Sequence, residues 1–135
     1  MATTSSHIAE CRCGTVRVTC TGEPIRVSVC HCLACQRRTG SVFAAQARWP
    51  ADRVTLQGET RDYVRRADSG AQVSYRFCPG CGSTVAYTIE SEPAVIAVPM
   101  GAFADPGFQA PTLSYYESRK HRWVVLVGEG IEHYD

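Results

Sequence analysis

The sequence predicts one domain that is mostly β. Three observations support this fold class. Short segments alternate apolar and polar residues, as half-buried strands do. Glycine and proline turn signals separate these segments at short, regular spacing. Helical periodicity is weak, with candidates at residues 34–38 and 113–120 alone, and a chain of 135 residues has the length of a single domain.

The predicted strands follow one another along almost the whole chain. The first alternates clearly, with Val16, Val18 and Cys20 on one face, and we interpret Cys20 as a core residue. The last, "WVVLV", is entirely apolar. We expect residues 1–9 to be a flexible N-terminus and residues 10–135 to form the domain. In chain order, the predicted strands cover residues 13–22, 25–29, 41–49, 52–59, 61–66, 72–77, 83–89, 94–100 and 123–127.

Composition and charge exclude several classes of protein. Fourteen Lys and Arg residues nearly balance thirteen Asp and Glu residues, so a basic face for nucleic acid or for an anionic membrane is not expected. The apolar runs are too short to span a bilayer, and the N-terminus has no secretory pattern. We therefore expect a cytoplasmic protein, in a compartment where thiols stay reduced.

Eight cysteines are a high number for a reduced protein, and their spacing indicates metal ligands. Seven of them fall into three close groups. Cysteines two residues apart cannot easily form a disulfide with each other, but they can direct two sulfurs at one ion. The groups are Cys11 with Cys13, Cys30 with Cys32 and Cys35, and Cys78 with Cys81.

The segment "FCPGCG" is the strongest of these signals. Pro79 and Gly80 favour a tight turn that faces Cys78 and Cys81 toward one zinc ion. A redox-active C-x-x-C is the alternative, but it normally opens a helix in a βαβ unit, which this sequence lacks. Either the first cysteine group or two members of the second could complete a four-cysteine site. Counting favours the first group provisionally, because it leaves three cysteines for a second ion.

Three protein ligands with one open position are typical of a catalytic zinc. The alternative is a second structural zinc whose fourth ligand lies elsewhere in the chain. His31 lies between two ligands and should face away from them. His121, His133 or a carboxylate remain candidates for that fourth position.

The cysteine motifs resemble those of a known family. "CRCGTV" at Cys11, "CHCLACQRRTGSVF" at Cys30, "FCPGCGS" at Cys78 and the late segment "YYESRKHRWV" are similar to the glutathione-dependent formaldehyde-activating enzyme (GFA) and centromere protein V family. This resemblance implies a β-tent of packed antiparallel sheets with two zinc ions. It also implies the ligand sets: a structural zinc on Cys11, Cys13, Cys78 and Cys81, and a second zinc on Cys30, Cys32 and Cys35.

The resemblance further implies a carbon–sulfur lyase that joins glutathione to formaldehyde, with Cys30, Cys32 and Cys35 at the catalytic zinc. A similar thiol or another small aldehyde is also compatible with such a site. Arg37 and Arg38 could pair with a glutathione carboxylate or could simply be solvated charges. The tyrosines Tyr87, Tyr115 and Tyr116 could line the pocket, although a place in the core is the simpler interpretation. A non-catalytic zinc module that binds a partner protein is the alternative function.

Overall fold

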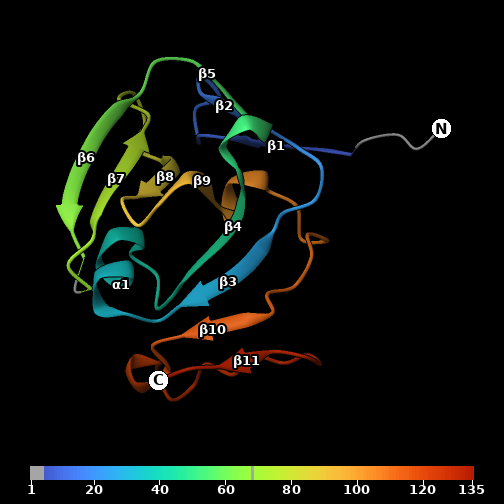
Figure 1. Ribbon diagram of the computed structural model, residues 1–135, viewed down its shortest axis with the longest axis vertical. Coiled ribbons are helices and arrows are strands. Elements are labelled where there is room, and N and C mark those ends of the chain that lie inside the picture. Colours follow the sequence, from blue (N-terminus) through green and yellow to red (C-terminus); the bar gives the residue numbers. More distant parts are fainter. Residues whose placement is uncertain (1–4, 68) are drawn as a thin grey trace.

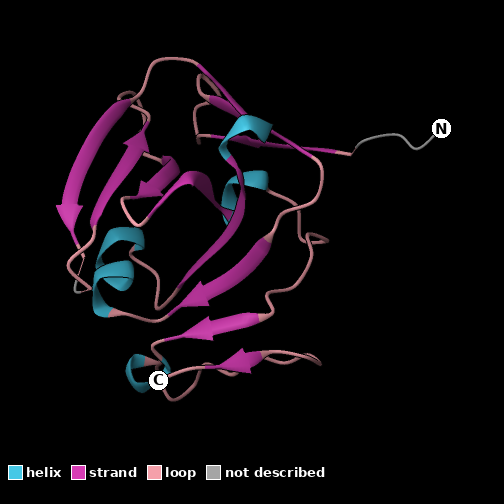
Figure 2. Cartoon of the chain, in the orientation of Figure 1, coloured by secondary structure: helices cyan, strands magenta, loops and turns pink. Residues whose placement is uncertain are grey.

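The computed structural model describes residues 5–67 and 69–135, and strands dominate this part of the chain (Figure 2). The one α-helix in it, α1 (Leu33–Thr39), confirms the helix expected near residues 34–38. No helix in the described ranges has the length and apolar character needed to cross a bilayer. The strands are β1 (Ser6–Glu10), β2 (Arg17–Thr21), β3 (Arg26–Cys30), β4 (Ala44–Pro50), β5 (Val54–Gln57), β6 (Arg61–Arg66), β7 (Gln72–Phe77), β8 (Thr84–Ile89), β9 (Glu92–Pro99), β10 (Leu113–Tyr115) and β11 (Glu132–His133).

These strands form two sheets. The small sheet has the order β1-β2-β5, and the large sheet has the order β11-β10-β3-β4-β9-β8-β7-β6. Neighbouring strands run antiparallel except β10, which is parallel to both β3 and β11. The large sheet bends so that β6 and β7 stand on one side of α1 and β3 on another (Figure 1). The expected mostly β fold of packed antiparallel sheets is therefore confirmed.

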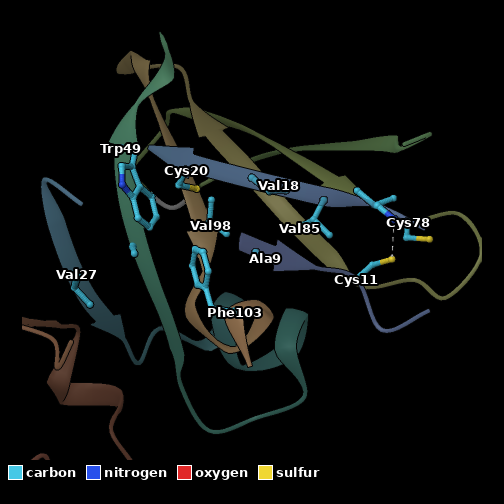
Figure 3. Close-up of a cluster of buried hydrophobic side chains, with 12 residues drawn as sticks. Ala9, Cys11, Val18, Cys20, Val27, Trp49, Cys78, Val85, Val98 and Phe103 are labelled. Atoms are coloured by element: carbon cyan, nitrogen blue, oxygen red, sulfur yellow. Dashed lines mark hydrogen bonds between the residues drawn. The ribbon is translucent and has the colours of Figure 1, made fainter. Parts of the chain in front are cut away.

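The main core lies between the two sheets. Val18 and Cys20 of β2 are fully buried there against Trp49, Val85 and Val98 of the large sheet (Figure 3). The alternation of β2 was therefore interpreted correctly. Burial raises the pKa of the Cys20 thiol to about 12, so this cysteine stays protonated and acts as a small apolar residue.

Strand β4 contributes to both faces of the large sheet. Ala47 and Trp49 point into the core, and the Trp49 indole N–H donates a hydrogen bond of 2.9 Å to the Gly22 carbonyl. Successive residues of a strand face opposite sides. Gln46 and Arg48 accordingly lie on the other face, which is the side occupied by α1 and by the pocket described below.

Three expectations about local structure differ from what is observed. Residues 123–127 form no strand, and the side chains of Trp123, Val125 and Val127 are exposed. Residues 113–120 hold β10 and a short 3₁₀ helix (Glu117–Arg119) instead of an α-helix, because β10 pairs with β3. In the N-terminal segment, residues 6–9 belong to β1, which pairs along its length with β2; residues 1–4 lie outside the described ranges.

Gly58, which follows β5, has a positive φ of 107° and lies against the backbone of Thr15. A β-carbon there would collide with the Thr15 carbonyl oxygen. We expect Gly58→Ala to lower the free energy of unfolding by about 3 kcal/mol or more, since it adds this collision to the strain of the left-handed conformation. Urea denaturation measures the effect.

Gly70→Ala is the matched control for this substitution. Gly70 has a φ of 92°, but none of the described atoms beyond its chain neighbours lies within 4 Å of an added β-carbon. Its replacement should cost only the conformational strain, about 1–2 kcal/mol. Equal losses in the two variants would show that contact with Thr15 is unimportant.

Candidate metal centres and the adjoining pocket

The first cysteine cluster joins the turns of two β-hairpins. Cys11 and Cys13 lie between β1 and β2 of the small sheet, whereas Cys78 and Cys81 lie between β7 and β8 of the large sheet. Their four Sγ atoms lie within 4.8 Å of one another. Cys11 and Cys78 stand together at one end of the main core (Figure 3). An ion held here would link the two sheets directly.

The geometry of this cluster suits a tetrahedral ion. The Cys13 Sγ atom is 3.7 Å from Cys11 Sγ and 3.7 Å from Cys78 Sγ. Zinc–sulfur bonds of about 2.3 Å in a tetrahedron require sulfur atoms about 3.8 Å apart. Backbone N–H groups of Val16 and Gly80 donate to the Sγ atoms of Cys11 and Cys78 at 3.2 and 3.3 Å, as expected for thiolates that bind a metal.

The second cluster lies where β3 leads into α1. Cys30 ends the strand, Cys32 caps the helix and Cys35 lies in its first turn; their Sγ atoms are also within 4.8 Å of one another. The Cys35 backbone N–H donates to Cys32 Sγ at 3.3 Å. Hydrogen bonds from the thiols of Cys30 and Cys35, followed by those from backbone N–H groups, lower the pKa of Cys32 to about 2. One thiolate of the set is thus stabilised before any metal binds.

The second cluster has three members among the described residues. His31 is fully buried, and its Nε2 lies 3.0 Å from Ser114 Oγ rather than within the cluster. The other two candidate histidines also have different partners: His121 Nε2 lies 2.9 Å from Gln36 Oε1, and His133 Nδ1 lies 2.6 Å from a Glu117 carboxylate oxygen.

A pocket of about 200 Å³ opens beside the second cluster and is lined by all three of its cysteines. Its walls come from α1 and from the face of the large sheet that is turned away from the main core. Tyr87, Tyr115 and Tyr116 line it. Tyr87 also belongs to a buried cluster with Tyr75, so the expected place in the core is confirmed for this tyrosine, whereas Tyr116 is exposed. Arg38 also lines it, with its guanidinium carbon 5.1 Å from the centre of the Tyr75 ring. Arg37 is absent from the lining and is exposed.

Sequence reasoning missed the polar floor of this pocket. Gln46 and Arg48 of β4 lie there, and both donate to the hydroxyl oxygen of Ser28 on β3, at 2.8 and 2.9 Å. All three residues are buried. The available signal was the pair of polar residues two apart within the otherwise apolar stretch "AAQARW", which places both side chains on one face of a central strand.

Comparison with protein families decides the identity of the fold. The sequence profile of the glutathione-dependent formaldehyde-activating enzyme family matches residues 6–119, which include both cysteine clusters. The chain belongs to this family. As a GFA family member it carries all seven motif cysteines in two groups that could each hold a metal ion.

The fold of this GFA family protein is also found in a solved structure. A Rhodobacter sphaeroides protein of known crystal structure aligns with a TM-score of 0.56 and 20% sequence identity, over 76% of this chain and 90% of that one. At this identity the likeness concerns the fold alone. A comparison with curated proteins finds no match.

Proposed function

We propose that the protein is a zinc-dependent carbon–sulfur lyase of the GFA type. It would join glutathione or a similar thiol to formaldehyde or another small aldehyde, and cleave the same adduct in reverse. The observation that carries this proposal is the difference between the two clusters. The four-cysteine cluster has a full tetrahedral ligand set at the edge of the core, whereas the three cysteines of the other line a pocket.

The residues fit zinc at both positions. Thiolates are preferred zinc ligands. The sulfur–sulfur distances of the four-cysteine cluster suit tetrahedral coordination, and the three Sγ atoms of the second cluster lie within 4.8 Å of one another. Cys11, Cys13, Cys78 and Cys81 would hold a structural ion, and Cys30, Cys32 and Cys35 would hold the second one. A zinc ion with three thiolate ligands favours a thiol in its ionised, nucleophilic form at neutral pH. None of the eight cysteines is paired in a disulfide. We propose that the protein works in the cytoplasm, where thiols stay reduced and can bind metal.

The chain's own residues would position the aldehyde and manage its proton. When the carbon–sulfur bond forms, the carbonyl π electrons move to oxygen, which gains a proton, while the thiol has lost one. Burial raises the pKa of both Tyr75 and Tyr87, so these phenols stay neutral and can donate a hydrogen bond to the aldehyde oxygen. The Arg38 guanidinium carbon lies 5.1 Å from the centre of the Tyr75 ring and 5.5 Å from the centre of the Tyr87 ring. Its positive charge would stabilise negative charge on the aldehyde oxygen at this end of the pocket.

The direct test combines metal content with a rate. Protein made with adequate zinc should contain two zinc ions per chain by elemental analysis. It should also accelerate exchange between formaldehyde, glutathione and their adduct above the uncatalysed rate, and mild chelation should remove this acceleration while the four-cysteine site keeps its ion. Disulfides in place of zinc would contradict the metal assignment.

A zinc module that binds a partner protein is the alternative function. The exposed apolar side chains of Trp123, Val125 and Val127 favour it, because such residues are uncommon together on a surface without a partner. Full zinc loading without binding of glutathione and without acceleration would support this alternative over the lyase.

A further inference from the structure

The floor of the pocket holds a buried cation in a fixed position. Arg48 is 8% exposed, Gln46 is 2% exposed and Ser28 is fully buried. The Ser28 hydroxyl oxygen accepts hydrogen bonds from both of the other side chains and so orients them. The strands that carry these residues are central in the large sheet, and the two Cα atoms of Ser28 and Gln46 are direct partners across it. The group is therefore rigid, which a specific binding site requires.

Two polar atoms of residues that line this pocket lack a partner among the described residues. Gln46 Oε1 and Arg38 Nε are buried and have no hydrogen bond among the described residues. Buried polar atoms are nearly always bonded, so these two indicate groups that a ligand would supply. Gln46 Oε1 requires a donor, and Arg38 Nε requires an acceptor.

The charges around the pocket are also unbalanced. None of the described lining residues is acidic. Glu92, which shares a small neighbouring cavity with Arg48, forms an ion pair of 3.2 Å with Arg26. Arg65 also lines the pocket and has interactions of its own. Apart from it, three thiolates around a divalent ion would leave one negative charge, which would offset one of the two guanidiniums of Arg38 and Arg48. The second cation remains for an anion, because buried charges are stable when paired.

We propose that this pocket selects a compact substrate that carries a carboxylate, bound by Arg48 and Arg38, with a hydroxyl or amine of the substrate donating to Gln46 Oε1. The inference rests on the proposed lyase function and specifies its substrate. Arginine suits a carboxylate because its N–H groups can bind both oxygens at once. The pocket of about 200 Å³ lies below the range of roughly 300–1,000 Å³ that holds larger ligands. The acid would belong either to the aldehyde or to the thiol. Formaldehyde has no carboxylate, whereas glutathione has two, so a short acidic thiol with a neutral isostere isolates the contribution of the acid.

Binding tests the site without requiring turnover. Calorimetric titration of the zinc-loaded protein should show that mercaptoacetate binds at least about tenfold more tightly than its neutral isostere mercaptoacetamide, as a hydrogen-bonded charge pair predicts. Arg48→Met should remove this preference. Gln46→Glu should remove the preference for the acid independently, because the new carboxylate would pair with Arg48. This second variant keeps the test valid if Arg48→Met fails to fold. Arg76→Met, on the other face of β7 from the pocket residue Tyr75, should behave as wild type.

Rates identify which reactant carries the acid. Glyoxylate against glycolaldehyde, each with glutathione, tests the aldehyde; mercaptoacetate against mercaptoacetamide, each with formaldehyde, tests the thiol. An acid preference in either pair that Arg48→Met abolishes supports the inference. Equal binding and equal rates for acid and neutral partners would overturn it, even in a protein that accelerates the glutathione reaction. Acid-selective binding with no acceleration of any pair would uphold the acid site and overturn the lyase instead.

Discussion

Cys78→Ser is expected to unfold the domain or to lower its free energy of unfolding by about 5 kcal/mol or more, because a structural zinc contributes its binding energy to folding. Cys78 is 1% exposed and belongs to the main core. Its cluster joins a hairpin of the small sheet to a hairpin of the large sheet. Loss of one ligand therefore weakens the contact between the sheets as well as the metal site.

Urea denaturation with elemental analysis measures this effect, and Cys20→Ala is the control. Cys20 is equally buried but lies outside both clusters. Its truncation should keep both zinc ions and cost about 1–2 kcal/mol, as a small core deletion does. A Cys78→Ser protein with the stability of Cys20→Ala would show that the four-cysteine cluster does not support the fold.

Cys32→Ser should have the opposite pattern: a folded protein that has lost the second zinc and returns the adduct-forming reaction to its uncatalysed rate. The three cysteines of this cluster lie outside the buried core clusters. Cys32 is also the N-cap of α1, and serine is a favoured residue at that position. The helix should therefore persist, and the free energy of unfolding should differ by less than about 1 kcal/mol from that of wild type whose second zinc has been removed by mild chelation.

Stability, zinc content and rate should be measured together on this variant. One zinc per chain, near-native stability and no acceleration are the expected result. If Cys32→Ser destabilises the protein as much as Cys78→Ser does, the second cluster is structural. Retention of full acceleration would separate catalysis from this cluster altogether.

The sequence predicted the cysteine clusters well because their geometry is local. Each close pair lies in a turn or at a strand end, where spacing alone directs two sulfurs to one side. Which pairs meet is a long-range matter, and counting ligands gave only a provisional answer. The bend of the large sheet that brings Tyr87 and Arg48 beside Cys30 leaves no trace in local spacing.

The failed secondary-structure predictions also result from long-range contacts, which local spacing does not reveal. The apolar segment at residues 123–127 suits a strand in composition, but it gains no pairing partner. Residues 113–115 have little strand character, yet parallel pairing with β3 makes them β10. Strand β1 is largely polar, and its pairing with β2 defines it. In each case tertiary contacts outweighed weak local preferences.

The two faces of β4 have a consequence for how this protein can diverge. Ala47 and Trp49 determine packing between the sheets, while Gln46 and Arg48, their immediate neighbours in sequence, face the pocket. Under the proposed function, point mutations at 46 and 48 would therefore change which compounds bind, with the packing between the sheets left intact. Mutations at 47 and 49 would instead be removed by selection for stability. Alternate residues of this one strand thus face either the pocket, where substitution would change substrate preference, or the core, where substitution would cost stability. Directed evolution of substrate preference should therefore begin at residues 46 and 48.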